Sequence, residues 1–137
     1  MKIKLTKPMF GWSAILLEEH KLNLSCIYDI PFMLCNLIED YLNYDVASCT
    51  FDNEQYLFTL VLNCFSVDAI EFKDNQTKLL HAEVDGDYFC KYIVEDLYDN
   101  IDEWSHSIYW LEGNQIDSYA FSLKEKLDEI KELLSTR

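Results

Sequence analysis

The chain has 137 residues, of which 50% are hydrophobic and 15% aromatic, and its formal net charge is −14 at pH 7. Disordered acidic segments lack such a share of hydrophobic and aromatic residues, so the composition predicts a folded protein. The length predicts a single domain over residues 1–137. A charge of this sign disfavours nucleic acid and anionic membrane as partners and favours a basic protein.

The acidic residues fall into two blocks along the chain. Between Leu22 and Phe72 there are eight Asp or Glu and no Lys or Arg. Between Glu83 and Asp117 there are ten acids against one base, Lys91. The field of these blocks attracts a partner of opposite charge, and it is the strongest indication of function in the sequence.

The sequence predicts a cytoplasmic protein. The lysines near the start are not followed by the apolar run of a secretory signal, and no stretch approaches the length of a membrane span. The cysteines form an odd set without a CxxC pair, which predicts reduced and mostly buried thiols rather than a disulfide framework. They are Cys26, Cys35, Cys49, Cys64 and Cys90.

The first part of the chain is expected to form strands and then a helix. Apolar or alternating runs at Lys2–Leu5, Ala14–Glu18 and Leu22–Tyr28 predict an edge strand and a hairpin with its turn at Glu19–Lys21. A helix is predicted at 31–43, because a proline stands near its first position and apolar residues follow at helical spacing.

A four-stranded antiparallel meander is expected next. Its strands are the runs Val46–Phe51, Tyr56–Leu62, Phe65–Phe72 and Leu79–Val84, which alternate with polar turns. The second of these runs is apolar on both faces, which is typical of a central strand.

The last third of the chain predicts two helices. A turn at Asp85–Asp87 is expected to cap a helix at about 88–103, whose buried stripe ends at Trp104. A short strand is expected at Ser107–Leu111.

The final helix is predicted at about 123–135. Ser122 and Glu125 fit a capping box, and Leu123, Leu127, Ile130 and Leu134 form one apolar stripe behind it. The sequence as a whole predicts an α+β fold, with an antiparallel sheet of five to seven strands and about three packed helices.

No catalytic or metal-binding motif is complete. His81-Ala82-Glu83 matches half of a zinc deaminase signature, but the P-C-x-x-C run that completes the zinc site is absent. Glu83, Asp85 and Asp87 alternate around Gly86 as calcium ligands do, but this glycine comes too early for an EF-hand loop. The sequence therefore predicts neither an enzyme nor a metal or cofactor site.

The second acidic block predicts a protein-binding surface on its helix. Glu95, Asp99 and Asp102 lie at i, i+4 and i+7, where like charges destabilise a helix by roughly 0.2–0.5 kcal/mol per pair. Natural sequences keep an unfavourable local arrangement, such as this repulsion between like charges, where function requires it. Aromatic anchors beside acids suit a tight interface in which charge accelerates the encounter. The candidate contact residues are Glu95, Asp96, Tyr98, Asp99, Asp102, Glu103 and Trp104.

In type, the whole chain resembles the immunity proteins of bacterial toxin systems, such as those that accompany contact-dependent growth-inhibition toxins. It is small, acidic, α+β and without a catalytic motif, and the segments Ser25–Pro31 and Phe51–Glu54 resemble landmarks of such a family. The resemblance implies a cytoplasmic bacterial protein that binds a cognate toxin domain, often a basic nuclease, and blocks it. It assigns no functional residue, because each toxin–immunity pair has its own interface.

Two other functions remain open. The chain also resembles type III secretion chaperones in size, charge and its amphipathic C-terminal helix, although those chaperones normally begin with a helix and are usually dimers. A DNA-mimic inhibitor, whose acids imitate the phosphate spacing of a duplex, is the third class. The sequence decides neither the oligomeric state, monomer or dimer, nor which of the two acidic blocks forms the interface.

Overall fold

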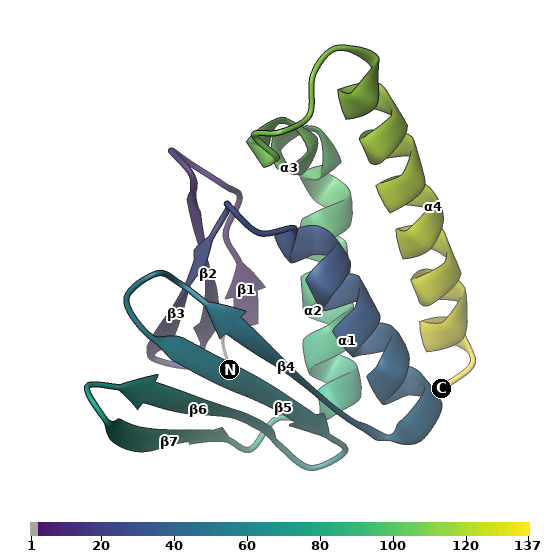
Figure 1. The fold of residues 1–137 in the computed structure, drawn as a ribbon. Coiled ribbons are helices and arrows are strands. Elements are labelled where there is room, and N and C mark those ends of the chain that lie inside the picture. Colours follow the sequence, from purple (N-terminus) through teal and green to yellow (C-terminus); the bar gives the residue numbers. More distant parts are fainter. Residues whose placement is uncertain (1–2) are drawn as a thin grey trace.

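The computed structural model describes residues 3–137, which form an α+β fold of four helices and two antiparallel sheets (Figure 1). The three-stranded sheet has the order β1-β2-β3, and the four-stranded sheet has the order β4-β5-β6-β7. The strands are β1 (Ile3–Leu5), β2 (Trp12–Leu17), β3 (His20–Ser25), β4 (Val46–Asp52), β5 (Leu57–Asn63), β6 (Val67–Lys73) and β7 (Gln76–Ala82). The helices are α1 (Ile30–Tyr44), α2 (Gly86–Asp99), α3 (Ile101–Ser107) and α4 (Asn114–Ser135).

The predicted α+β class and the four-stranded meander are confirmed, but the single sheet is not. Each pairing within residues 3–137 joins strands that are consecutive in the chain, and none joins β3 to β4. The reason is that α1 lies between these two strands and leads the chain away before β4 begins. The seven strands therefore divide between two sheets.

The helix α1 begins and ends close to the predicted positions. Asp29 caps it by accepting a hydrogen bond from the Phe32 N–H at 3.3 Å, and Pro31 stands in the first turn. The helix stops at Asp45, whose φ of 63° is left-handed and whose N–H donates to the Tyr41 carbonyl.

The helix predicted at 88–103 is two helices that meet at Asn100. Asp85 caps α2 as predicted, by accepting a hydrogen bond from the Asp87 N–H at 2.8 Å. The strand predicted at Ser107–Leu111 is wrong. This segment folds back on itself instead, because the Leu111 N–H donates to the Ile108 carbonyl at 3.1 Å and closes a turn.

The last helix is longer than its predicted span of 123–135. It begins at Asn114, after Gly113 turns the chain with a φ of 54°, so Ser122 lies inside the helix and the capping-box prediction is wrong. The apolar stripe extends back through the half-buried Ile116 and Tyr119. The predicted burial of Leu123, Leu127 and Ile130 is confirmed.

The helices lie together on one side of the four-stranded sheet (Figure 1). Helix α1 packs against β4 and α4, while α2 packs against β1 and α4, so one core joins both sheets to the helices. The opposite face of the four-stranded sheet is open, and Leu57, Phe72 and Leu79 on that face are exposed. None of the helices described within residues 3–137 has both the length and the apolar composition that a membrane crossing needs.

None of the five cysteines forms a disulfide, and three of them are buried. Burial raises the pKa of Cys26 to about 11 and that of Cys35 to about 12, so both thiols stay protonated at neutral pH. Cys64 is the exposed member of the set.

Candidate functional site

Four of the predicted contact residues form an exposed acidic surface over α2 and α3. Glu95 and Asp99 face solvent on α2, and Asp102 and Glu103 face solvent in the first turn of α3. Within residues 3–137, only Asp102 among these four has an ion-pair partner, His106 at 3.5 Å. We call these four residues the helix surface.

Asp96, the fifth predicted contact residue, holds the first strand to α2. Its half-buried carboxylate accepts a hydrogen bond from the Leu5 N–H at 2.8 Å, across 91 positions of sequence. Burial raises the pKa of Asp96, although the hydrogen bond from Leu5 and the charge of Lys4 act in the opposite direction. The structure therefore gives Asp96 a role within the fold, which is to accept the hydrogen bond of a backbone N–H group of β1.

Tyr98 and Trp104 also have roles within the fold. The Tyr98 ring lies under the ammonium of Lys131, 3.2 Å from the ring centroid, and Lys124 lies at 5.8 Å, so this contact joins α2 to α4. Trp104 is only 1% exposed, as its place on the predicted buried stripe requires. Neither of these two predicted aromatic residues is therefore a free anchor, although Tyr109 and Trp110, which follow α3, are exposed and contact each other.

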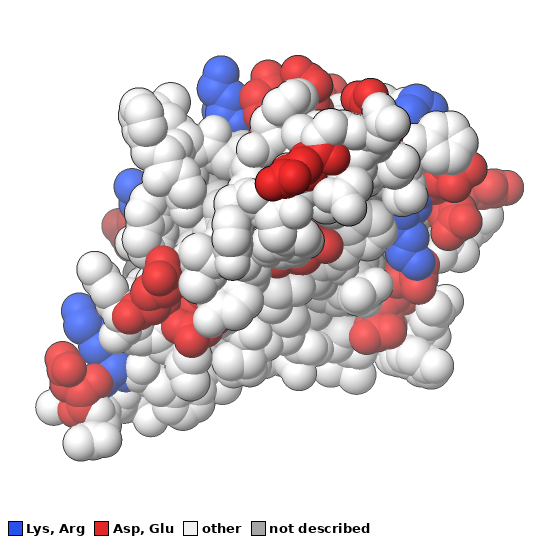
Figure 2. Space-filling view, turned by 45° about the horizontal axis from the view of Figure 1, so that its top comes forward, with Lys and Arg blue, Asp and Glu red and all other residues white. Residues whose placement is uncertain are grey.

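Figure 2 shows Asp and Glu in several separate groups on the face that it displays, with broad uncharged areas between them. On that face the acidic residues therefore do not merge into one continuous patch.

A second candidate surface forms where the two landmark segments of the first acidic block meet. The Ser25 hydroxyl donates to Glu54 Oε2 at 2.8 Å, and the Tyr28 hydroxyl donates to Asp52 Oδ2 at 3.2 Å. These contacts bring the connection between β3 and α1 against the turn between β4 and β5. The structure therefore brings together the segments Ser25–Pro31 and Phe51–Glu54, whereas the sequence alone does not show that they are in contact.

The turn between β1 and β2 lies beside the same connection, because the Gly11 carbonyl accepts the Cys26 N–H at 2.9 Å. The three segments lie on the same side of the molecule in Figure 1. We call them together the turn surface, and they are Met9–Trp12, Ile27–Tyr28 and Asp52–Gln55.

Large apolar side chains are exposed on the turn surface. Phe10 is 95% exposed and Met9 is more than half exposed, while Trp12 and Tyr28 are exposed over roughly two fifths of their surface. The sequence patterns did not predict this surface. The one local signal was Phe10 before Gly11, because the residue before glycine in such a turn is normally Asn, Asp or Gly.

A hollow of about 210 Å³ lies within the turn surface, lined by Trp12, Asn23, Asn53 and Gln55. Asn53 is buried, and its Oδ1 accepts the N–H groups of Gln55 and Tyr56 at 3.2 and 3.0 Å. The amide orientation is thereby fixed, with Nδ2 as the remaining donor. Within residues 3–137, that Nδ2 has no hydrogen-bond partner.

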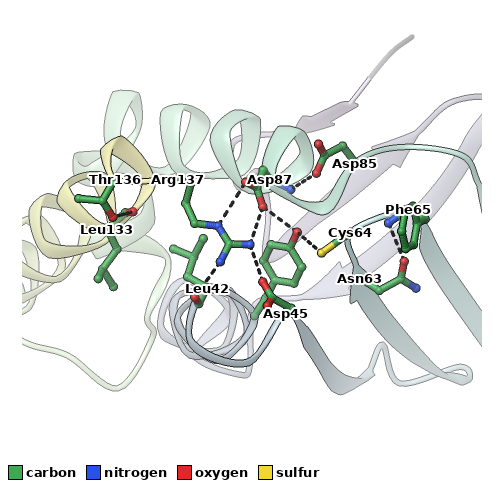
Figure 3. A network of polar contacts seen from close by, with 11 residues as sticks. Leu42, Asp45, Asn63, Cys64, Phe65, Asp85, Asp87, Leu133, Thr136 and Arg137 are labelled. Atoms are coloured by element: carbon green, nitrogen blue, oxygen red, sulfur yellow. Dashed lines mark hydrogen bonds and ion pairs between the residues drawn. The ribbon is translucent and has the colours of Figure 1, made fainter.

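A third polar cluster lies where α1, α2 and α4 meet, and Figure 3 shows Arg137 at its centre. The guanidinium donates to Asp87 at 3.0 Å, to Asp45 at 2.9 Å and to the Leu42 carbonyl at 3.0 Å. The Tyr41 hydroxyl donates to the same Asp87 at 2.7 Å. The Arg137 guanidinium, and then the Tyr41 hydroxyl, hold the pKa of Asp87 below its usual value, although burial opposes them.

This cluster joins helices, and its charged groups are paired with one another. The Asp87 carboxylate is occupied by Arg137 and Tyr41, and the burial of Tyr41, together with its bond to Asp87, raises the pKa of its hydroxyl. Cys64 lies 3.8 Å from the Tyr41 hydroxyl and is exposed. The arrangement is that of a structural clamp, which we call the Arg137 clamp.

The residues of the incomplete zinc and calcium patterns lie apart in different contacts. His81 pairs with Asp68 across neighbouring strands, on the open face of the four-stranded sheet. Asp85 caps α2, and Asp87 belongs to the Arg137 clamp. Within residues 3–137, no three His, Cys, Asp or Glu side chains gather in a way that could hold a metal ion.

Comparison of the chain with known proteins identifies no family. No family model matches the chain, and no curated protein or solved structure is significantly similar to it.

Proposed function

We propose that this protein is an immunity protein that binds a cognate, basic toxin domain and blocks its active site or the entry of its substrate. The observation that carries the proposal is the helix surface. Its four carboxylates face solvent on consecutive helices, and three of them have no ion-pair partner within residues 3–137. Carboxylates held on rigid helices are ready acceptors for Lys and Arg of a partner.

The charge of the whole chain supports the same proposal. Of its 25 acidic residues, six take part in ion pairs within residues 3–137, and two of those six pair with histidine. Most of the negative charge is therefore uncompensated inside the molecule. A field of this kind steers a basic partner and accelerates its association.

The test uses the protein domain encoded beside the gene for this chain, purified with its active site inactivated. We expect it to bind, with an association rate that falls at least about tenfold between about 20 and 500 mM salt, because the steering field is screened. Co-expression with the active domain should restore growth. If the neighbouring domain neither binds nor is neutralised, the proposal is wrong.

A charge reversal tests the part played by the helix surface. Asp99→Lys/Asp102→Lys should weaken binding by about 2–5 kcal/mol if these charges are paired and desolvated in the complex, and by less than about 1 kcal/mol at a solvated rim. The matched control is Glu19→Lys/Glu125→Lys, which changes the net charge equally at two exposed sites elsewhere. If both double variants bind alike, the helix surface is not part of the interface.

A further inference from the structure

We infer that the turn surface is the anchoring part of the partner interface, and that it receives an apolar patch bordered by Lys and Arg on a basic protein. The inference rests on the proposed function and extends it, because it names a surface outside the helix surface. Four independent features of the turn surface point to it, namely exposed aromatic side chains, a strained backbone, unpaired acids and a buried unpaired donor.

The first feature is the exposed apolar side chains. Phe10 is 95% exposed and Met9 59%, so neither side chain contributes to the core. Trp12 and Tyr28 present further aromatic area beside them, and the contact between Gly11 and Cys26 holds the two segments together. Aromatic residues clustered in this way are the usual source of binding energy in protein interfaces.

The second feature is the backbone conformation of Phe10. Met9 and Trp12 exchange two backbone hydrogen bonds, at 2.8 and 3.1 Å, and the two residues between them both have positive φ. This is the geometry of a type I′ turn, which prefers Asn, Asp or Gly in its centre and disfavours a large aromatic residue. Phe10 neither fits the turn nor packs in the core, so its presence is not explained by folding. A role in binding a partner explains it.

The third feature is the charge beside these aromatic groups. Asp52 and Glu54 are exposed and accept hydrogen bonds from the neutral Tyr28 and Ser25, and neither has an ion-pair partner within residues 3–137. Of the bases near these segments, Lys7 precedes Met9 in the chain, and Lys73 lies 5.6 Å from the ring centroid of Tyr56 rather than in an ion pair with either acid. A partner that places Lys or Arg opposite the two acids is complementary to the turn surface.

The fourth feature is the hollow beside Trp12. Asn53 lines it, is 2% exposed, and keeps an Nδ2 donor without a partner within residues 3–137. A buried donor without a partner is unfavourable in the free protein. The hollow beside it is lined mainly by side-chain amides, which offer hydrogen bonds to the backbone of a partner next to the aromatic groups of the turn surface.

The experiment compares substitutions that the backbone accepts. Phe10 and Glu54 both have positive φ, a conformation that Asn tolerates, so Phe10→Asn/Glu54→Asn keeps both turns while it removes the anchor, one charge and the acceptor of the Ser25 hydroxyl. The control is Phe65→Asn, which removes an 87% exposed phenylalanine from the β5–β6 turn, at the opposite end of the meander. Affinity for the inactivated neighbouring domain is measured by calorimetry, after circular dichroism confirms that each variant is folded.

We expect the double variant to bind at least about 30-fold more weakly, as the loss of a binding hot spot requires, and the control to bind within about twofold of the wild type. If the wild type binds the domain and the double variant matches it, the turn surface is not the anchor, although the proposed function stands. If the wild type does not bind, the proposed function fails first. A wild-type dimer in sedimentation that the double variant abolishes would assign the turn surface to self-association and overturn the inference.

Discussion

Gly86 lies so close to Tyr41 that a Cβ atom at position 86 would stand 2.6 Å from the phenol Cζ and 2.5 Å from the Asn63 carbonyl oxygen. The absence of a side chain lets the first turn of α2 approach the last turns of α1. That approach places Asp87 within hydrogen-bond distance of the Tyr41 hydroxyl, at 2.7 Å. The geometry of the Arg137 clamp therefore depends on a glycine at position 86.

We predict that Gly86→Ala destabilises the protein by about 2 kcal/mol. Overpacking against the ring and a backbone carbonyl costs about 1–3 kcal/mol, and the better helix propensity of Ala offsets less than about 1 kcal/mol of it. Urea unfolding measures the difference. Ser118→Ala on the exposed face of α4 is the control and should change the free energy of unfolding by less than about 0.5 kcal/mol. A Gly86→Ala variant as stable as the control would contradict the close contact.

The Arg137 clamp predicts a pH-dependent effect of Asp87→Asn. The folded pKa of Asp87 is lowered, chiefly by Arg137, so its ionised form stabilises the folded state above the unfolded pKa of about 3.9. This stabilisation is lost as the pH falls through the folded pKa. We expect the variant to be less stable by about 1 kcal/mol at pH 7, because the pair is partly exposed, and to match the wild type near pH 2.

Unfolding free energies from urea titrations between pH 2 and 7 provide the measurement. Asp40→Asn is the matched control, since this exposed carboxylate on α1 makes no ion pair within residues 3–137. A deficit of the Asp87→Asn variant that is the same at every pH would show that the charge of Asp87 is not what holds the clamp.

Asp96 should show the opposite pH dependence. Its folded pKa is raised by burial, so the stabilisation from binding its proton is complete below the unfolded pKa and is lost as the pH rises through the folded pKa. We predict that Asp96→Asn is as stable as the wild type near pH 3 and up to about 1 kcal/mol more stable at pH 7, since an amide oxygen still accepts the Leu5 N–H.

Asp96→Ala is the companion variant, because it removes the acceptor of the Leu5 N–H altogether. It should cost about 1–2 kcal/mol near pH 3 and less at pH 7, because the wild type itself has by then lost the stabilisation from the Asp96 proton. The same urea titrations measure both variants. Equal losses in the Asn and Ala variants at pH 7 would show that the negative charge itself is needed at this position.

The parts of the fold that depend on local patterns could be predicted from the sequence. A proline in the first turn and a capping aspartate, Asp29, mark the start of α1, and polar turns separate the strands of the meander. The break between α2 and α3 could not be predicted in this way. Leu97, Ile101 and Trp104 keep helical spacing across Asn100, so the apolar period runs on where the helix stops.

The candidate site was only partly predictable for a similar reason. Tyr98 and Trp104 stand beside acids in the sequence, but the turn of the helix directs Trp104 into the core and Tyr98 towards the lysines of α4. The turn surface joins segments that lie up to 46 positions apart, from Met9 to Gln55. Contacts between such distant segments depend on the packing of one sheet beside the other. No periodic pattern in the sequence predicts them.

The conformation of Phe10 leads to a prediction about stability that is independent of any partner. We predict that Phe10→Asn makes the protein more stable by about 0.5–1 kcal/mol, because Asn adopts the positive φ of this turn with less strain. Little packing is lost in exchange, since the Phe10 side chain is 95% exposed. Phe65→Asn, at a position without positive φ, should leave the stability within about 0.5 kcal/mol of the wild type.

Urea unfolding provides this measurement as well, with an unchanged denaturant slope showing that only the folded turn has been affected. A loss of stability in Phe10→Asn would mean that the phenyl ring packs on its surroundings and stabilises the turn, which would supply a folding reason for Phe10. A gain in stability together with weaker binding of the neighbouring domain would show that Phe10 serves binding, although it makes the turn less stable. That combination separates the two possible reasons for a phenylalanine at this position, because a residue retained for folding cannot be replaced with a gain in stability.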